Sequence, residues 1–305
     1  MSDHRLGKVM TILRGAAAIA CWFALSASLM ATPVILGVTA DSQLVQINPL
    51  TGAASGAVTL DGSYNPLGIA WDGTSLYLFG QNNGDLRQVT NLTTGTTSEV
   101  ATPLAGLPST GGFVPTKGDL TYYEGSFFVA STALADGSFD PNYGSLFSIA
   151  DAAGYAAAQV DSGTFPKVGG LAFGPGGVFY GLDQFGNTLF TLNATAGTST
   201  ASTPLSGFDP SVDTVGGLVF GSDGTLYAAI SADGVTSEWF SINPKTGVAT
   251  DIGSMGNYDI VGLALLGSPV VNSVPEPASF VLIGTGALVL MVLKGRRLKG
   301  RRLKG

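Results

Sequence analysis

The sequence predicts an all-β protein, a β-propeller of about five four-stranded blades, with six blades as the alternative. Two features of composition and pattern lead to this prediction. Charged residues make up 11% of the 305-residue chain and glycines number 44, whereas ~25% of the residues of soluble proteins are charged. A strand-and-turn unit also recurs along the chain, and such a fixed period indicates a repeat architecture. The ends of the repeating region supply the third observation, which concerns closure.

Two elements define the repeat. The first is an apolar strand followed by a turn that ends in glycine, and its five copies begin at Leu44, Leu86, Leu146, Leu189 and Trp239. The second is a glycine-rich strand such as Val168-Gly-Gly-Leu-Ala-Phe173, whose copies end at Trp71, Tyr122, Phe173, Phe220 and Leu265. These ends are spaced by 51, 51, 47 and 45 residues, and the copy at 119–122 is the weakest. Tight turns such as Asp72-Gly73 and Asp223-Gly224 connect each glycine-rich strand to an aromatic strand. Each unit is therefore four short antiparallel strands, the size of one propeller blade.

The two ends of the repeating region complete one blade between them. The stretch from Val34 to Val38 matches the second strand of a unit, and the stretch from Val261 to Leu265 matches a first strand. Joining them closes the ring of sheets and leaves no free edge. A β-sandwich or β-solenoid would explain the strands but not the matched ends. Six blades remain open because the interval from 95 to 154 is long enough to hold a degenerate unit.

Both termini of the chain predict membrane targeting. Residues 1–31 combine Arg5, Lys8 and Arg14 with the apolar run from Ala16 to Met30, as a secretory signal peptide does. Near the other end, a linker at 271–277 precedes 16 uncharged residues at 278–293, which as a helix would be about 24 Å long. The tail at 294–305 carries seven cations, so it is expected to stay cytoplasmic and act as a stop-transfer signal. The basic cluster that directly follows the predicted transmembrane helix is Lys294, Arg296 and Arg297.

The C-terminal region resembles a known sorting signal. Val274-Pro275-Glu276-Pro277, an apolar helix and an arginine cluster, in this order, resemble the PEP-CTERM signal of Gram-negative bacteria. The resemblance implies export across the inner membrane, anchoring by the helix, and processing by exosortase, a membrane protease that releases the body to the cell envelope or the exterior. Bacteria with such proteins often make extracellular polysaccharide. The resemblance covers about thirty residues, and the repeated LKGRR units extend the tail beyond the family's usual end.

Charge and residue usage exclude several functions of the body, residues 32–270. Four cations and 19 acids lie there, a net charge of −15, so nucleic-acid partners are excluded because too few cations can neutralise the phosphates. The single histidine, His4, and the single cysteine, Cys21, both lie in the predicted signal peptide. The mature body therefore lacks Ser-His-Asp and Cys-His catalysis, disulfides, and zinc sites built from histidine or cysteine. Catalysis would have to use carboxylates, tyrosines, lysines or an oxygen-ligated metal.

Candidate ligand-binding residues are the aspartates near the predicted inner strands, because propellers bind at the mouth of the central channel. These are Asp61, Asp119, Asp183, Asp213 and Asp259. For each, the simpler explanation is a turn-capping aspartate, because Asp favours turns for local hydrogen bonding. The chain has no DxDxDG loop, so no cofactor is expected, although an oxygen-ligated calcium stays open.

Two functions fit the sequence. The first is a non-catalytic binding or structural protein of the cell envelope or extracellular matrix, with polysaccharide or a surface protein as its partner. The alternative is a metal-dependent hydrolase or lyase of the lactonase kind. The absence of histidine from the body favours the first, so the chain is not expected to be an enzyme.

Overall fold

The computed structural model describes residues 33–267 except 63–64, 81–83, 102–103, 108–118, 132–142, 152–153, 162–164, 184, 186, 208–213 and 232–233. All described residues belong to one compact unit that spans residues 1–269. The expected signal peptide (1–31), PEP motif (274–277), membrane helix (278–293) and basic tail (294–305) lie outside them. Among the described residues, no helix has both the length and the apolar character needed to cross a membrane.

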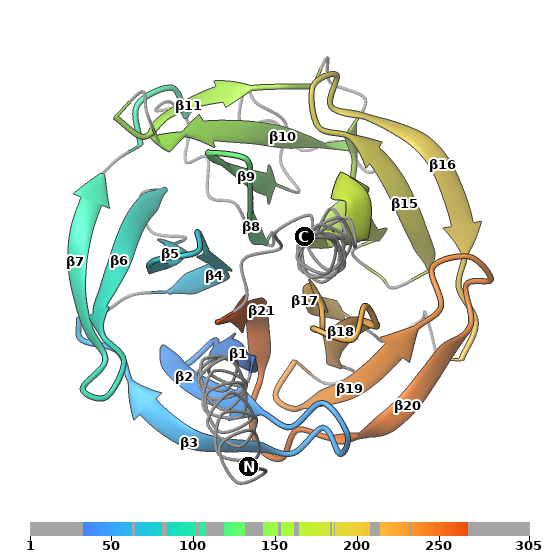
Figure 1. Ribbon diagram of the computed structural model, residues 1–305, viewed down its shortest axis with the longest axis horizontal. Coiled ribbons are helices and arrows are strands. Elements are labelled where there is room, and N and C mark those ends of the chain that lie inside the picture. Colours follow the sequence, from blue (N-terminus) through green and yellow to red (C-terminus); the bar gives the residue numbers. More distant parts are fainter. Residues whose placement is uncertain are drawn as a thin grey trace, which may run out of the picture. The chain divides into compact units, whose positions relative to one another are not determined.

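Five antiparallel sheets surround one central axis (Figure 1). Apart from the short 3-10 turn η2 (Pro175–Gly177), every described helix or strand is a β-strand. The prediction of an all-β propeller with five blades is therefore confirmed for the described part of the chain, where no sixth blade is found. We number the blades in chain order and give their strands from the axis outward.

Each blade has four strands, and one blade has an additional short strand. Blade 1 contains β21 (Ile260–Leu266), β1 (Val34–Thr39), β2 (Gln43–Ile47) and β3 (Ala54–Thr59). Blade 2 contains β4 (Pro66–Trp71), β5 (Leu76–Gly80), β6 (Asp85–Asn91) and β7 (Thr96–Ala101). Blade 3 contains β8 (Leu120–Tyr123), β9 (Ser126–Ser131), β10 (Tyr143–Ala150) and β11 (Ala156–Gln159), with the extra β12 (Phe165–Pro166) paired to β10. Blade 4 contains β13 (Val168–Phe173), β14 (Phe179–Asp183), β15 (Thr188–Asn193) and β16 (Thr198–Pro204). Blade 5 contains β17 (Thr214–Phe220), β18 (Leu226–Ser231), β19 (Ser237–Ile242) and β20 (Ala249–Ser254).

Blade 1 is shared between the two ends of the repeating region, as predicted. Strand β1 pairs antiparallel with β21 on its inner side and with β2 on its outer side. The β1–β21 register runs from Val34 opposite Leu266 to Val38 opposite Gly262. Backbone hydrogen bonds between the first and last described strands therefore close the ring.

The inner strands approach one another so closely that glycine is required between them. A Cβ atom added to Gly262 of β21 would lie 2.7 Å from the Cα of Gly68 in β4. One added to Gly68 would collide with the backbone nitrogen of Leu120 in β8. Gly170 faces the same restriction, because its Cβ would lie 2.9 Å from that of Leu218. The glycine-rich repeat thus reflects contact between backbones at the axis.

Aromatic side chains fill the seams between blades 2 and 3 and between blades 3 and 4. Tyr77 of blade 2 and Phe127 of blade 3 have ring centroids 4.8 Å apart. Tyr123 of blade 3 stacks on Phe173 of blade 4 at 4.3 Å, with ring planes 10° apart. These pairs contribute both apolar burial and favourable ring geometry. They account for the aromatic residues of β5, β8, β9 and β13 that form these pairs.

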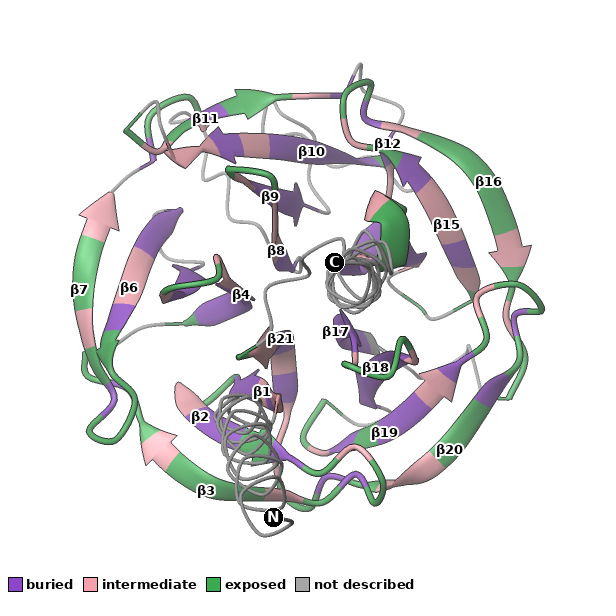
Figure 2. Ribbon diagram, in the orientation of Figure 1, coloured by how far each residue is buried: buried purple, intermediate pink, exposed green. Residues whose placement is uncertain are grey.

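The outermost strands β3, β7, β16 and β20 are mostly exposed or half-buried, whereas the inner strands form the core (Figure 2). The turns that precede these outer strands join each blade to its neighbour. The carbonyl of Gly95 in the blade 2 turn accepts the N–H of Asp61, which follows β3, at 3.0 Å. The carbonyl of Gly247 in the blade 5 turn accepts the N–H of Ser206, which follows β16, also at 3.0 Å. Gly95 and Gly247 thus serve the interface with the preceding blade.

Deletion of residues 34–40 tests the shared blade. Without β1, the inner strand β21 loses its partner and exposes a sheet edge, so the chain should become insoluble or melt far below the parent. Thermal denaturation followed by circular dichroism measures this. Truncation after residue 267, which leaves every described strand in place, is the matched control and should keep the parental melting temperature. A β1 deletion that melts within a degree or two of the parent would contradict the closure.

Candidate functional site

The axis of the propeller holds one fully buried acid, Asp119, which immediately precedes β8. Its Oδ1 accepts the N–H of Leu120 at 2.8 Å. Its Oδ2 accepts the N–H of Leu171 in β13 at 3.1 Å and the N–H of Leu218 in β17 at 3.2 Å. One carboxyl group therefore joins the inner strands of blades 3, 4 and 5.

Asp119 occupies the repeat position that is glycine in the other four blades. The equivalent residues directly precede the leucine or isoleucine that recurs in each inner strand. They are Gly68, Gly170, Gly217 and Gly262. The glycine-rich element at 119–122, in blade 3, thus matches the others weakly because an acid replaces the glycine. Because the side chain has no exposure to solvent, its position fits a structural role and leaves no access for a substrate.

Burial determines the titration of this group. Desolvation raises the pKa of the Asp119 carboxyl well above its ordinary value, and the bonds from Leu171, Leu120 and Leu218 lower it in part. The direction of the net shift means that the folded protein retains a proton at a pH where the unfolded chain has released it.

Asp119→Gly tests the role of the carboxyl group. Glycine is the residue of the other four blades, so the backbones can still pack, but the N–H groups of Leu171 and Leu218 lose their acceptor in the core. We expect a loss of about 2–5 kcal/mol in the free energy of unfolding, measured by urea denaturation. Asp61→Ala, which removes an exposed acid at the blade rim, is the control and should cost far less. Equal stability of Asp119→Gly and the parent would contradict the proposed bridging role.

The pH dependence of stability should also depend on Asp119. A raised folded pKa contributes stability that is complete below the unfolded value of about 3.9 and is lost as pH rises through the folded value. Relative to Asp119→Asn, which cannot titrate, the parent should therefore lose stability as the pH increases above about 4. Urea midpoints of both proteins at a series of pH values measure the difference. Parallel curves for the two proteins would show that Asp119 does not titrate with folding.

The other candidate aspartates do not gather with Asp119. Asp61 lies at the outer rim, where its Oδ1 accepts the N–H and hydroxyl of Thr97 at 2.9 and 2.6 Å. Asp183 ends β14 and accepts the N–H of Phe185 at 2.8 Å, while burial raises its pKa. The backbone carbonyl of Asp259 accepts the N–H of Ala40 at 2.9 Å, and Asp213 lies outside the described residues. Within the described ranges, no three His, Cys, Asp or Glu side chains are arranged to hold a metal ion.

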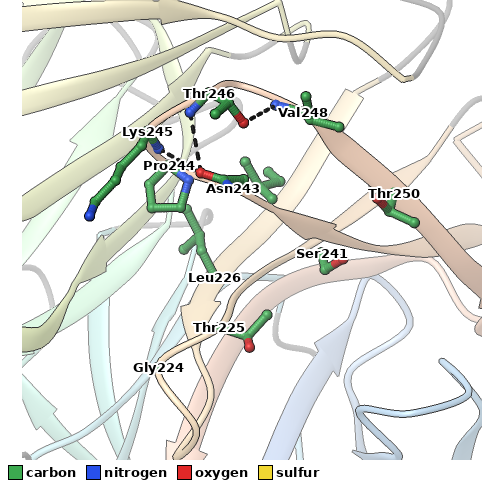
Figure 3. A pocket seen from close by; sticks show the side chains of 11 residues that line it. Gly224, Thr225, Leu226, Ser241, Asn243, Pro244, Lys245, Thr246, Val248 and Thr250 are labelled. Carbon is green, nitrogen blue, oxygen red and sulfur yellow. Dashed lines mark hydrogen bonds between the residues drawn. The ribbon is translucent and has the colours of Figure 1, made fainter.

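A groove of about 710 Å³ lies on blade 5 (Figure 3). It is formed by the β17–β18 turn, the start of β18, the end of β19 and the β19–β20 turn. In Figure 3, Lys245 and Thr250 lie at opposite ends of the labelled residues, with Thr225 and Ser241 between them. The lining residues are Gly224, Thr225, Leu226, Ser241, Ile242, Asn243, Pro244, Lys245, Thr246, Val248 and Thr250. We call this the blade 5 groove.

The turn at one side of the blade 5 groove is held by its own backbone. The Oδ1 of Asn243 accepts the N–H groups of Lys245 and Thr246 at 3.0 and 3.2 Å. The carbonyl of Asn243 accepts the N–H of Gly247 at 2.9 Å, and Gly247 has a φ of 73°, a conformation that favours glycine. Lys245 therefore extends from a hydrogen-bonded turn. The lining of the groove offers hydroxyl, amide and ammonium groups, and it contains no carboxylate for acid–base chemistry.

Sequence reasoning did not find the blade 5 groove. Its lining contains none of the five candidate aspartates, and threonines in an outer hairpin are ordinary strand residues. One signal was present: Lys245 is the single cation in the five recurring turns between the third and fourth strands of the blades. The predicted sorting residues Val274, Pro275, Glu276 and Pro277, with the cluster of Lys294, Arg296 and Arg297, lie outside the described residues.

Comparison with known families bears on the C-terminal motif. By its fold, the described part of the chain is a five-bladed β-propeller. The family model of the PEP-CTERM protein-sorting motif matches residues 273–297, so the chain carries this motif at its C-terminus. The motif implies an exported, surface-sorted protein that exosortase processes. No curated protein matches the sequence.

Solved structures resemble this chain at low identity. One is a structural-genomics protein of unknown function from Bacteroides thetaiotaomicron, 14% identical, with a TM-score of 0.40 over 72% of this chain and 50% of that one. A luciferin-regenerating enzyme is 12% identical, with a TM-score of 0.42 over 74% and 78% of the two chains. An engineered GH43 glycoside hydrolase with endo-xylanase and exo-arabinofuranosidase activity is 12% identical, with a TM-score of 0.46 over 62% and 41%. The chain thus spans about half the length of the first of these proteins.

Proposed function

We propose that this chain is an exported, non-catalytic binding protein of the bacterial cell envelope or extracellular matrix. Its C-terminal segment anchors it in the inner membrane until exosortase releases the propeller, which then engages extracellular polysaccharide or another surface component. The observation that carries the proposal is the PEP-CTERM motif at 273–297, which follows a closed propeller.

The chemistry of the described residues supports a binding role. Asp119, the one acid on the axis among them, is fully buried and has its oxygens occupied by backbone N–H groups. The blade 5 groove contains no acidic residue and no histidine, so it lacks a general acid–base pair. The lactonase-like alternative, with its oxygen-ligated calcium, stays a prediction that no described residue favours.

Replacement of Glu276 by glutamine tests the sorting step. In a recognition motif, the carboxylate of Glu276 makes a charge-assisted bond worth roughly 1.5–3 kcal/mol, so its loss should weaken binding about tenfold to a hundredfold. In a host that contains exosortase, Glu276→Gln should accumulate at its unprocessed mass in the inner membrane, while the parent loses its tail. Mass spectrometry of membrane and released fractions measures this.

Glu124→Gln is the matched control, because it removes the same charge from an exposed turn of the propeller. It should be processed like the parent. If Glu276→Gln and the parent release bodies of equal mass in equal amounts, the motif is a spacer and the proposed sorting step is wrong.

A further inference from the structure

We infer that the blade 5 groove binds a segment of an acidic polysaccharide, a hydroxyl-rich chain that carries uronate carboxylates. This inference names the ligand class for the binding role proposed above and rests on that proposal. Three observations carry it: a side chain that fills the equivalent place in blade 2, the charge of the lining, and the mixture of polar groups along it.

Ser241, which lines the groove, is a short side chain at a position that a long side chain fills in blade 2. Ser241 lies opposite Tyr227, and in blade 2 the same register position, opposite Tyr77, is Gln88. The Nε2 of Gln88 donates to the Oγ of Ser75 at 2.7 Å and so crosses from β6 to the start of β5. Thr225 is the blade 5 counterpart of Ser75, since each directly precedes the first residue of its strand. The serine at position 241 is too short for this crossing, as are Ser148 and Thr191 at the same register position in blades 3 and 4.

The lining has the opposite charge balance to the rest of the body. Its single charged residue is Lys245, and none of its residues is acidic, although acids outnumber cations 19 to four over residues 32–270. One acid, Asp223, adjoins the lining at Thr225, where its carboxylate accepts the N–H and hydroxyl of Thr225 at 3.0 and 2.9 Å. Salt screens charges beyond about 8 Å at physiological ionic strength, so acids farther away on the body act only weakly on a ligand at Lys245.

The polar groups of the groove match a hydroxylated chain. Thr225, Ser241, Thr246 and Thr250 contribute hydroxyls, which both donate and accept, and Asn243 contributes an amide. Pro244 and Val248 provide apolar surface between them. A sugar ring presents hydroxyls at its edge and C–H groups on its faces, so it can use both kinds of contact. A uronate adds the carboxylate that Lys245 can pair with.

Ser241→Gln tests the inference by copying blade 2 into blade 5. The glutamine should cross to Thr225 and fill the groove without unfolding the sheet, since the chain already accommodates this arrangement at Gln88. Binding of an oligogalacturonate to the full-length chain in neutral detergent is measured by isothermal titration calorimetry. We expect the Kd to rise at least tenfold in Ser241→Gln and severalfold in Lys245→Gln, with the salt dependence of binding reduced in the latter.

Thr191→Gln is the matched control. Thr191 has the same register position in blade 4, opposite Tyr180, and its hairpin turn contains no cation, so the Kd should stay within twofold of the parental value. A neutral cello-oligosaccharide of equal length should bind more weakly than the uronate, and a polyglutamate peptide should not bind. Unchanged uronate affinity in Ser241→Gln, equal affinity for the neutral sugar, equal affinity for polyglutamate, or no uronate binding by the parent would each overturn the inference. None of these results depends on processing at Glu276, so the sorting proposal stands or falls separately.

Discussion

The fold depends on the contact between inner strands at the axis, where backbones meet with no room for ordinary side chains. In four blades the contact position is glycine, and Gly68 and Gly262 show that even a methyl group would not fit. In blade 3 the position is Asp119, whose carboxyl group accepts N–H groups from three inner strands. A buried N–H without an acceptor costs free energy, so the Asp119 carboxyl group satisfies N–H groups of the neighbouring inner strands that would otherwise be unpaired.

This arrangement concentrates the irregular features of the ring in blade 3. Its inner strand β8 has four residues, and its sheet carries the additional strand β12. The aromatic seams compensate on both sides of the blade: Tyr77 packs on Phe127 toward blade 2, and Tyr123 stacks on Phe173 toward blade 4. Two kinds of interaction therefore stabilise blade 3: apolar burial of aromatic rings at the seams and hydrogen bonds to Asp119 at the axis.

The sequence was sufficient for the propeller and its closure, and it favoured five blades over six, because these features depend on local patterns. Glycine-rich strands, turn glycines and the phase of Val34–Val38 against Val261–Leu265 can be recognised one segment at a time. Asp119 was identified as a candidate, but its role depends on N–H groups from Leu171 and Leu218, which lie 52 and 99 residues away in sequence. The blade 5 groove was missed because it appears only when strands of different blades are compared in register, with Ser241 set against Gln88.

Chain order connects the stability of the ring with the sorting of the protein. The closing strand β21 ends at Leu266, and the sorting motif begins at residue 273. Cleavage within or beyond the motif therefore removes no described strand and leaves the pairing of β1 with β21 intact. Because both ends of the repeating region are held in one blade, removal of the tail does not expose a sheet edge. The turns of the outer hairpins take no part in the axial contact. Side chains such as Ser241 and Lys245, on which the binding inferred for blade 5 rests, can therefore vary while the glycines and Asp119 keep the ring closed.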